Sequence, residues 1–97
     1  MAPTPAISVV IPTLGRWTLL AIAVAAARAQ RNVEVQIVVA LDGETNADQP
    51  FLAGDDVIVL PSEEHRGVGA TRNAGMAAAE GDWIALLDDD DLWAPDK

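Results

Sequence analysis

Four short, largely apolar runs recur along this sequence, and an alanine-rich segment follows the first and precedes the last. The runs cover residues 7–11, 34–41, 57–60 and 83–87. Each is short enough for a single strand and stops at a proline or an acidic residue, which is typical of a buried strand followed by a turn. The alanine-rich segments predict two helices, from Trp17 or Thr18 to about Gln30 and from Ala70 to Glu80.

This order of elements predicts an α/β fold. A strand that is followed by a helix and then by another strand usually pairs in parallel with it. We therefore expect a Rossmann-like parallel sheet of about four strands, with helices on its faces. A chain of 97 residues provides one domain at most, so residues 1–97 are expected to form a single domain.

Individual residues mark the expected ends of the first strand and the first helix. Pro12 closes the strand and opens a loop, and Thr18 is a candidate N-cap for the helix that follows. Arg28 and Arg31 stand near the end of that helix, where cations complement the negative end of the helix dipole.

The second half of the chain contains similar signals. Residues 44–56 contain several acids together with Asn46, Pro50 and Gly54, and are expected to form a loop with one helical turn near Phe51. Gly81 follows the second predicted helix in the position that a helix C-terminus favours. The apolar run from Trp83 to Leu87 is expected to form a buried strand.

Charge and cysteine content exclude several functional classes. The chain has 15 acidic residues against 6 Lys and Arg, a formal net charge of −9, whereas nucleic acids and anionic membranes require clustered cations. There is no cysteine, which excludes disulfides and thiolate zinc sites. The single histidine, His65, leaves a zinc site only carboxylates as other ligands.

The sequence predicts neither a secretory signal nor a membrane span. Residues 1–5 lack the basic start of a signal peptide. The longest apolar run, from Leu19 to Ala27, is far shorter than the roughly 20 residues that cross a bilayer. A cytoplasmic location is the resulting expectation.

Polar residues follow every predicted strand. They are Thr13, Asp42, Glu63 to Arg66, and Asp88 to Asp91. The carboxyl ends of parallel strands meet at one edge of the sheet, where ligands of such sheets bind. Four adjacent carboxylates repel one another unless a cation neutralises them, and Mg²⁺ or Mn²⁺ is the partner that oxygen ligands favour. The alternative is a solvated acidic turn.

Three further features could bind a ligand. Asp42, before Gly43, could accept hydrogen bonds from a base or a ribose, or it could be an ordinary turn aspartate. The segment 67–69, Gly-Val-Gly, offers backbone N–H groups at a helix start, although its spacing is not that of a phosphate-binding loop. Arg72 in the first helical turn is unfavourable for the helix dipole, so it should face a ligand or form a bridge to Asp42 or to the acidic run.

Four ordered motifs resemble the family 2 glycosyltransferases of the GT-A fold. They are Ile7 to Thr13, Val38 to Gly43, Arg66 to Gly75 and Gly81 to Trp93. The specific part is the combination of Arg-Asn-x-Gly with Leu-Asp-x-Asp-Asp. The motifs cover nearly the whole chain and correspond to the N-terminal, nucleotide-binding half of that fold.

The resemblance implies a donor of the nucleotide-diphosphate sugar type, a UDP- or dTDP-sugar, and inverting transfer to an acceptor hydroxyl. It implies that Thr13 and Asp42 hold the base, that Arg72 contacts the nucleotide and that Pro12 also belongs to the nucleotide-binding site. It further implies that Asp88 and Asp90 bind Mn²⁺ or Mg²⁺, with Asp89 or Asp91 assisting at the ribose or a metal-bound water.

The chain also departs from the family pattern. Leu41 replaces the first of two acids before Gly43, and Gly15 rather than Asn precedes Arg16. The general base and the acceptor half are expected beyond Lys97, so the chain is expected to be catalytically incomplete. An exposed sheet edge would then favour self-association or pairing with the absent half.

Two other functions remain open. The chain could be a nucleotide-binding module without turnover. It could also be a phosphotransferase or phosphatase with a nucleophilic aspartate, but that class has Asp-x-Asp-Gly-Thr near its N-terminus, whereas here Asp88 is followed by Asp-Asp-Asp-Leu near the C-terminus.

Overall fold

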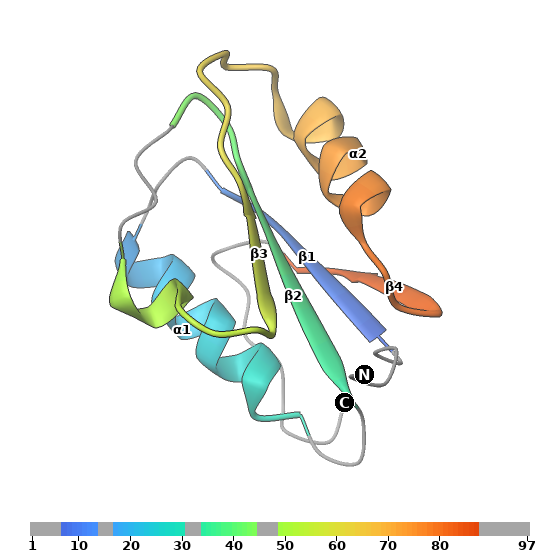
Figure 1. The fold of residues 1–97 in the computed structure, drawn as a ribbon. Helices are drawn as coiled ribbons and strands as arrows, with labels where there is room; N and C mark the ends of the chain where they lie inside the picture. Colours follow the sequence, from blue (N-terminus) through green and yellow to red (C-terminus); the bar gives the residue numbers. More distant parts are fainter. Residues whose placement is uncertain (1–6, 14–16, 31–33, 45–48, 88–97) are drawn as a thin grey trace.

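A computed structural model describes residues 7–13, 17–30, 34–44 and 49–87 (Figure 1). In chain order, its elements are β1 (Ile7–Thr13), α1 (Trp17–Arg28), β2 (Val35–Leu41), the 3-10 turn η1 (Pro50–Leu52), β3 (Val57–Leu60), α2 (Val68–Ala78) and β4 (Trp83–Leu86). The helical turn expected near Phe51 is confirmed as η1.

The four strands form one sheet in the order β3-β2-β1-β4, and every neighbouring pair is parallel. The predicted α/β fold with a parallel sheet is therefore confirmed. Because the chain builds outward from β1 to β3 and then returns to the far side of β1, the strand order reverses between β1 and β4. Sheets of this kind bind ligands at the carboxyl ends of the strands beside such a reversal.

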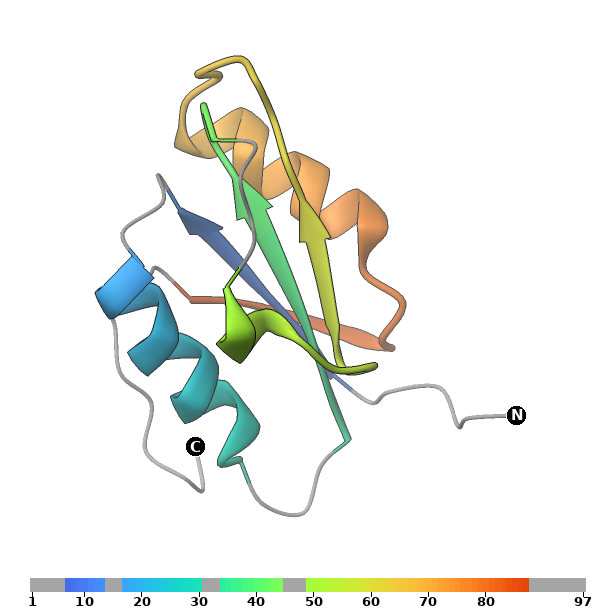
Figure 2. The same cartoon turned by 60° about the vertical axis from the view of Figure 1, so that its left-hand side comes forward.

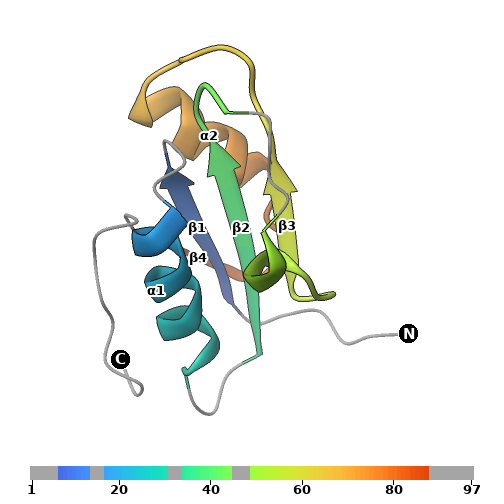
Figure 3. The same ribbon diagram turned by 90° about the vertical axis from the view of Figure 1, so that its left-hand side faces the viewer.

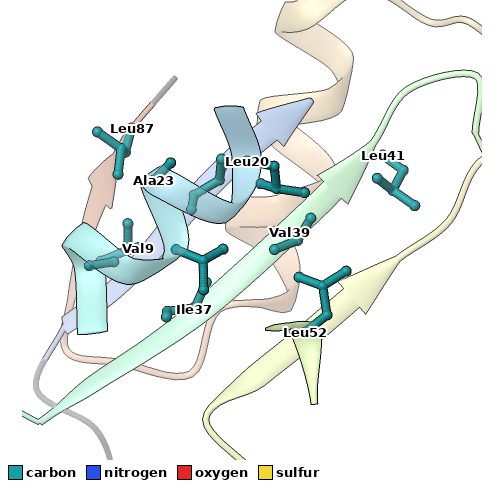
Figure 4. Close-up of a cluster of buried hydrophobic side chains, with 11 residues drawn as sticks. Val9, Leu20, Ala23, Ile37, Val39, Leu41, Leu52 and Leu87 are labelled. Atoms are coloured by element: carbon teal, nitrogen blue, oxygen red, sulfur yellow. The ribbon is translucent and has the colours of Figure 1, made fainter. Parts of the chain in front are cut away.

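The two helices cover opposite faces of the sheet, as Figure 2 shows. The face under α1 contains the main core, in which alternate residues of β1 and β2 meet one side of the helix. Its buried members are Val9, Ile11, Leu20, Ala23, Val24, Ala27, Ile37, Val39, Leu41, Leu52 and Leu87 (Figure 4). This arrangement accounts for the alanines of α1, since small side chains let a helix approach a sheet closely.

The first strand continues beyond its predicted end. Pro12 was expected to close it at Ile11, but β1 pairs with β2 as far as Thr13. Thr13 accepts a hydrogen bond from Asp42 on the β2 side, whereas the carbonyl of Val10 accepts one from Leu87 on the β4 side. Strand residues alternate between the two sides, so the missing N–H of Pro12 falls on the β4 side, beyond the last β1–β4 pair. The β1–β2 ladder therefore loses no hydrogen bond to Pro12.

The predicted start of α1 is confirmed, but the predicted N-cap was wrong. The helix begins at Trp17, which places Thr18 inside the first turn rather than at the N-cap. Arg28 does lie in the last turn, as expected, but its guanidinium binds Asp56 and the carbonyl oxygens of Phe51 and Ala53. Arg31 lies outside the described residues.

Helix α2 starts and ends two residues earlier than predicted. At its end, the backbone N–H groups of Glu80 and Gly81 donate to the side chains of Gln36 and Ser8, at 3.0 and 2.8 Å. These bonds draw the chain onto the sheet and end the helix at Ala78. Gly81 is not a helix cap, because the helix ends at Ala78 and its C-cap is Ala79. A Cβ at Gly81 would stand 2.8 Å from the backbone nitrogen of Ser8. Close contact between backbones explains the glycine.

Strand β4 is not the buried strand that its sequence predicted. The side chains of Trp83, Ile84 and Leu86 are 74%, 45% and 46% exposed, and Leu87 just after the strand is buried. The register places Ile84 and Leu86 beside Ser8 and Val10, on the face that α2 covers. However, α2 packs over β1 and β2, so β4 extends beyond its cover.

Candidate functional site

The ends of β1 and β2 bring two predicted site residues together at the carboxyl edge of the sheet (Figure 3). Thr13 and Asp42 belong to adjacent strands, and the backbone N–H of Asp42 donates to the carbonyl of Thr13 at 2.9 Å. Both residues are nearly inaccessible, at 4% and 5% exposure. Pro12 precedes Thr13 and is also buried.

The carboxylate of Asp42 is the electrostatic centre of this edge. One oxygen accepts the backbone N–H of Arg66 at 2.5 Å, and the other accepts that of Gly67 at 3.0 Å. The Nδ1 atom of His65 lies 3.2 Å from the second oxygen. The partners of Asp42 therefore form one continuous segment, 65–67, just before α2.

These contacts set the acidity of Asp42. Burial by itself would raise the pKa of the carboxyl. The hydrogen bonds from Arg66 and Gly67, together with His65, outweigh burial and hold the pKa of Asp42 below its ordinary value. Asp42 is thus a carboxylate at neutral pH, stabilised by donors from the chain itself.

Gly67 links Asp42 to the start of α2. It has φ +90°, a conformation that favours glycine, and it occupies the N-cap position. Its carbonyl oxygen accepts both the hydroxyl and the backbone N–H of Thr71, at 2.7 and 3.1 Å. Arg72, which the sequence predicted to face a ligand, follows Thr71 in this turn and is half-buried.

A second set of backbone contacts holds the loops after β2 and β3 together. The N–H of Gly43 donates to the carbonyl of Glu64, and that of Ser62 donates to the carbonyl of Glu44. Gly43 has φ +73°, which permits the turn that directs the chain toward this loop. Sequence reasoning missed these contacts because their donors and acceptors are backbone groups, which no residue pattern reveals.

The position before Asp42 contains no second carboxylate. Leu41 is completely buried and belongs to the core under α1. Its side chain points into that layer in Figure 4. Where the family pattern has an acid, this chain has a core residue.

The acidic run lies outside the described residues, so the predicted roles of Asp88, Asp89, Asp90 and Asp91 stay predictions. Leu87, the residue before the run, is buried, and its N–H donates to the carbonyl of Val10 at 3.0 Å. It therefore anchors the chain next to β1, at the place where the strand order reverses. Among the described residues, no three His, Cys, Asp or Glu side chains are grouped closely enough to hold a metal ion.

Comparison with known proteins identifies the family. The family described as Glycosyl transferase family 2 matches residues 8–97. The chain therefore belongs to the family 2 glycosyltransferases, and the predicted resemblance is confirmed. It is 34% identical to the succinoglycan biosynthesis protein ExoO of Rhizobium meliloti, over 96% of this chain and 28% of that protein. It is 30% identical to the putative glycosyltransferase EpsH of Bacillus subtilis, again over 96% of this chain and 28% of the relative.

A solved structure has the same fold. The crystal structure of TarS residues 1–349 from S. aureus aligns with 90% of this chain and 28% of its own, with a TM-score of 0.73 and 24% identity. The chain thus spans less than a third of the length of these relatives. In the part of the chain that the structure describes, no helix has both the length and the apolar character needed to cross a membrane.

Proposed function

We propose that this chain binds a nucleotide-diphosphate sugar at the carboxyl edge of its sheet and serves inverting transfer of the sugar to an acceptor hydroxyl. A UDP- or dTDP-sugar is the proposed donor. One observation supports this most strongly: in a chain of this family, Thr13 and Asp42 meet at that edge of the sheet. Leu87, which precedes the acidic run in the sequence, is buried and bonded to β1.

The proposed roles follow the positions of the residues. Pro12 and Thr13, at the end of β1, would contact the nucleotide, and Arg72 would reach it from the first turn of α2. Asp88 and Asp90 would hold Mg²⁺ or Mn²⁺, and Asp89 would assist at the ribose. The oxygen ligands of a run of aspartates fit these hard cations. Such a cation would supply positive charge to the diphosphate as it departs.

The proposal assigns only part of the reaction to these residues. Since the chain spans about 28% of its relatives ExoO and EpsH, we assign the general base and the acceptor site to regions of those proteins that it does not match. The same coverage leaves a second function open, a nucleotide-binding module without turnover. Assays of the chain for sugar transfer and donor hydrolysis distinguish the two, because any turnover excludes the module.

The first experiment is an amide-resolved NMR titration of the chain with UDP, with and without Mg²⁺. We expect Mg²⁺-dependent shifts at Thr13, at Arg72 and in the acidic run. Shifts that are absent, or scattered over the sheet, would contradict a donor site at this edge.

Substitution of one acid tests the metal assignment. Asp90→Ala should abolish the Mg²⁺-dependent part of UDP binding, because it removes one of two proposed ligands. The matched control is Asp82→Ala, which removes the same charge from an exposed position before β4, at the opposite end of the sheet. Unchanged affinity in Asp90→Ala, or equal losses in both variants, would overturn the assignment.

A further inference from the structure

Ser8 and Gln36 are buried polar residues that the proposed site does not use. They are 0% and 7% exposed, and they pair with each other near the start of β1 and β2, at the edge of the sheet opposite to that site. The hydroxyl of Ser8 donates to Oε1 of Gln36 at 2.7 Å. Buried polar groups are held by such partners, and this pair has further partners outside the strands.

The further partners belong to the segment that links α2 to β4, beside the start of β1 (Figure 1). The backbone N–H of Gly81 donates to the hydroxyl oxygen of Ser8 at 2.8 Å, and that of Glu80 donates to Oε1 of Gln36 at 3.0 Å. Nε2 of Gln36 donates in turn to the carboxylate of Glu80 at 2.7 Å. Two consecutive backbone groups are thus bound to the sheet just before β4 begins.

The apolar pattern of β4 does not specify its register against β1. Trp83, Ile84 and Leu86 are exposed, and Leu87 is the side chain of this stretch that enters the core. A shift by one residue would put Leu86 in the place of Leu87. Because the two side chains are identical, burial hardly distinguishes the two registers. The register of β4 therefore depends on contacts outside the strand.

Gly81 makes the observed register specific. A Cβ at its position would stand 2.8 Å from the backbone nitrogen of Ser8 and 2.9 Å from the carbonyl carbon of Ile7, so the backbone would have to move. A shift by one residue would bring either Glu80 or Asp82 to this position, and both have a Cβ. The observed register alone places a glycine there, with its N–H on Ser8. Ser8, Gln36 and Gly81 together form the anchor of β4.

We propose that the anchor of β4 consists of positioning residues, which fix the register of β4 on β1 and thereby the point from which the acidic run continues after Leu87. This inference rests on the proposed function and deepens it, because it names what places the proposed metal ligands. A shift by one residue would move the start of the run by about 3.3 Å and reverse the face on which each residue of the strand lies. Mg²⁺ demands ligand distances of about 2.0–2.1 Å, so a shifted run would not hold the ion in the same place.

The first test needs no nucleotide and follows the amide of Leu87. This N–H donates to the carbonyl of Val10, at the end of β4 that lies farthest from the anchor. Ser8→Ala removes the acceptor of Gly81 and adds no bulk. We expect hydrogen exchange at Leu87 to accelerate about tenfold, because β4 then leaves its register more often.

Other amides show whether the effect has this cause. The amides of Ile37 and Val39 in the central strand β2 should exchange as before, which shows that the fold persists. Acceleration that is confined to Glu80 and Gly81, with Leu87 unchanged, would mean that the contacts act only locally. That result would overturn the proposal.

A second variant and a matched control complete this test. Gln36→Leu removes the acceptor of Glu80 instead of that of Gly81, so it should accelerate exchange at Leu87 as well. Glu80→Ala is the control, because it removes the exposed carboxylate that Gln36 contacts but leaves both backbone donations. Its effect on Leu87 should be less than about twofold. A control effect as large as that of Ser8→Ala would refute anchoring through the backbone.

The second test separates placement of the metal ligands from a general loss of stability. UDP binding is measured with and without Mg²⁺ for the unaltered chain and for Ser8→Ala. We expect the affinity with Mg²⁺ to fall about tenfold. The affinity without Mg²⁺ should change less than about twofold, because Thr13 and Arg72 lie outside β4. Equal losses under both conditions, or no loss with Mg²⁺, would overturn the proposal.

The two tests distinguish failure of this inference from failure of the proposed function. If the unaltered chain shows no Mg²⁺-dependent binding of UDP, the proposed function fails, and the role toward the metal fails with it. Hydrogen exchange at Leu87 still decides whether the anchor sets the register of β4.

Discussion

At the scale of single residues, the glycine of the Arg-Asn-x-Gly motif, Gly75, has a packing role beside any ligand role. Gly75 lies on the side of α2 that faces the sheet, and a Cβ there would stand 2.4 Å from Cγ1 of Val10. Val10 is completely buried and has a branched, stiff side chain that cannot easily move aside. Gly75 therefore sets how closely α2 approaches β1.

This role predicts the effect of one added methyl group. Gly75→Ala should lower the free energy of unfolding by about 1–3 kcal/mol, because the close-packed interface must shift to accept it. The measurement is urea unfolding, with Gly69→Ala as the control. Gly69 is in the same helix but has open space around it, so its substitution should raise stability by about 0.4–1 kcal/mol.

A compensating change tests the cause. If the clash with Val10 is responsible, Val10→Ala should cost less in the Gly75→Ala background than in the unaltered chain. If Val10→Ala lowers the free energy of unfolding equally in the two backgrounds, the destabilisation by Gly75→Ala arises from another contact of α2.

At the scale of elements, the end of α1 and the loop before β3 are held together by one side chain. The guanidinium of Arg28 binds Asp56 through two nitrogens, at 2.9 and 3.2 Å. It also donates to the carbonyls of Phe51 and Ala53, on either side of the end of η1. Gly54, with φ +130°, allows the turn between them. Leu52 enters the core from η1, so this clamp positions a core residue.

The clamp predicts a pH-dependent stability. The hydrogen bond from Arg28 holds the pKa of Asp56 below its ordinary value. A carboxyl with a lowered pKa stabilises the fold above its unfolded pKa of about 3.9, and this contribution is lost as the pH falls through the folded pKa. Asp56→Asn should therefore cost about 1 kcal/mol at pH 7, the upper range for a partly exposed ion pair.

Urea unfolding at several pH values between roughly 7 and 3 measures this effect. The stability difference between the unaltered chain and Asp56→Asn should shrink toward the acidic end. Asp55→Asn is the control, because it removes the same charge from the exposed neighbouring position. A difference for Asp56→Asn that stays constant with pH, or that Asp55→Asn reproduces, would contradict the clamp.

At the scale of the whole molecule, the sequence was sufficient for the order of the elements, the parallel sheet and the edge at which polar residues gather. The limits of α2 were not predictable, because the N–H groups of Glu80 and Gly81 bond to Gln36 and Ser8, far away in the sequence. The same holds for Asp42, because two of its three partners are backbone N–H groups of a distant loop. An apolar run is buried only if another element packs against it. The residues of the run itself do not reveal which element that is.

Strand β4 is the clearest case of that limit, and it leads to a prediction about the chain in solution. Among the described residues, β4 has a neighbouring strand on one side only. Its residues Trp83, Ile84 and Leu86 are exposed. An apolar edge strand invites pairing with another chain. We expect this chain to self-associate through β4, with the sedimentation coefficient rising as its concentration increases.

Ile84→Lys should shift the chain toward monomer, since it places a charge on the pairing surface beside an unpaired backbone edge. Ile22→Lys is the control, because Ile22 in α1 is exposed to nearly the same extent, 47% against 45%, but is not on an edge strand. Equal effects of the two lysines would mean that association follows general hydrophobicity. A chain that stays monomeric at every concentration would show that the β4 edge is protected without a partner.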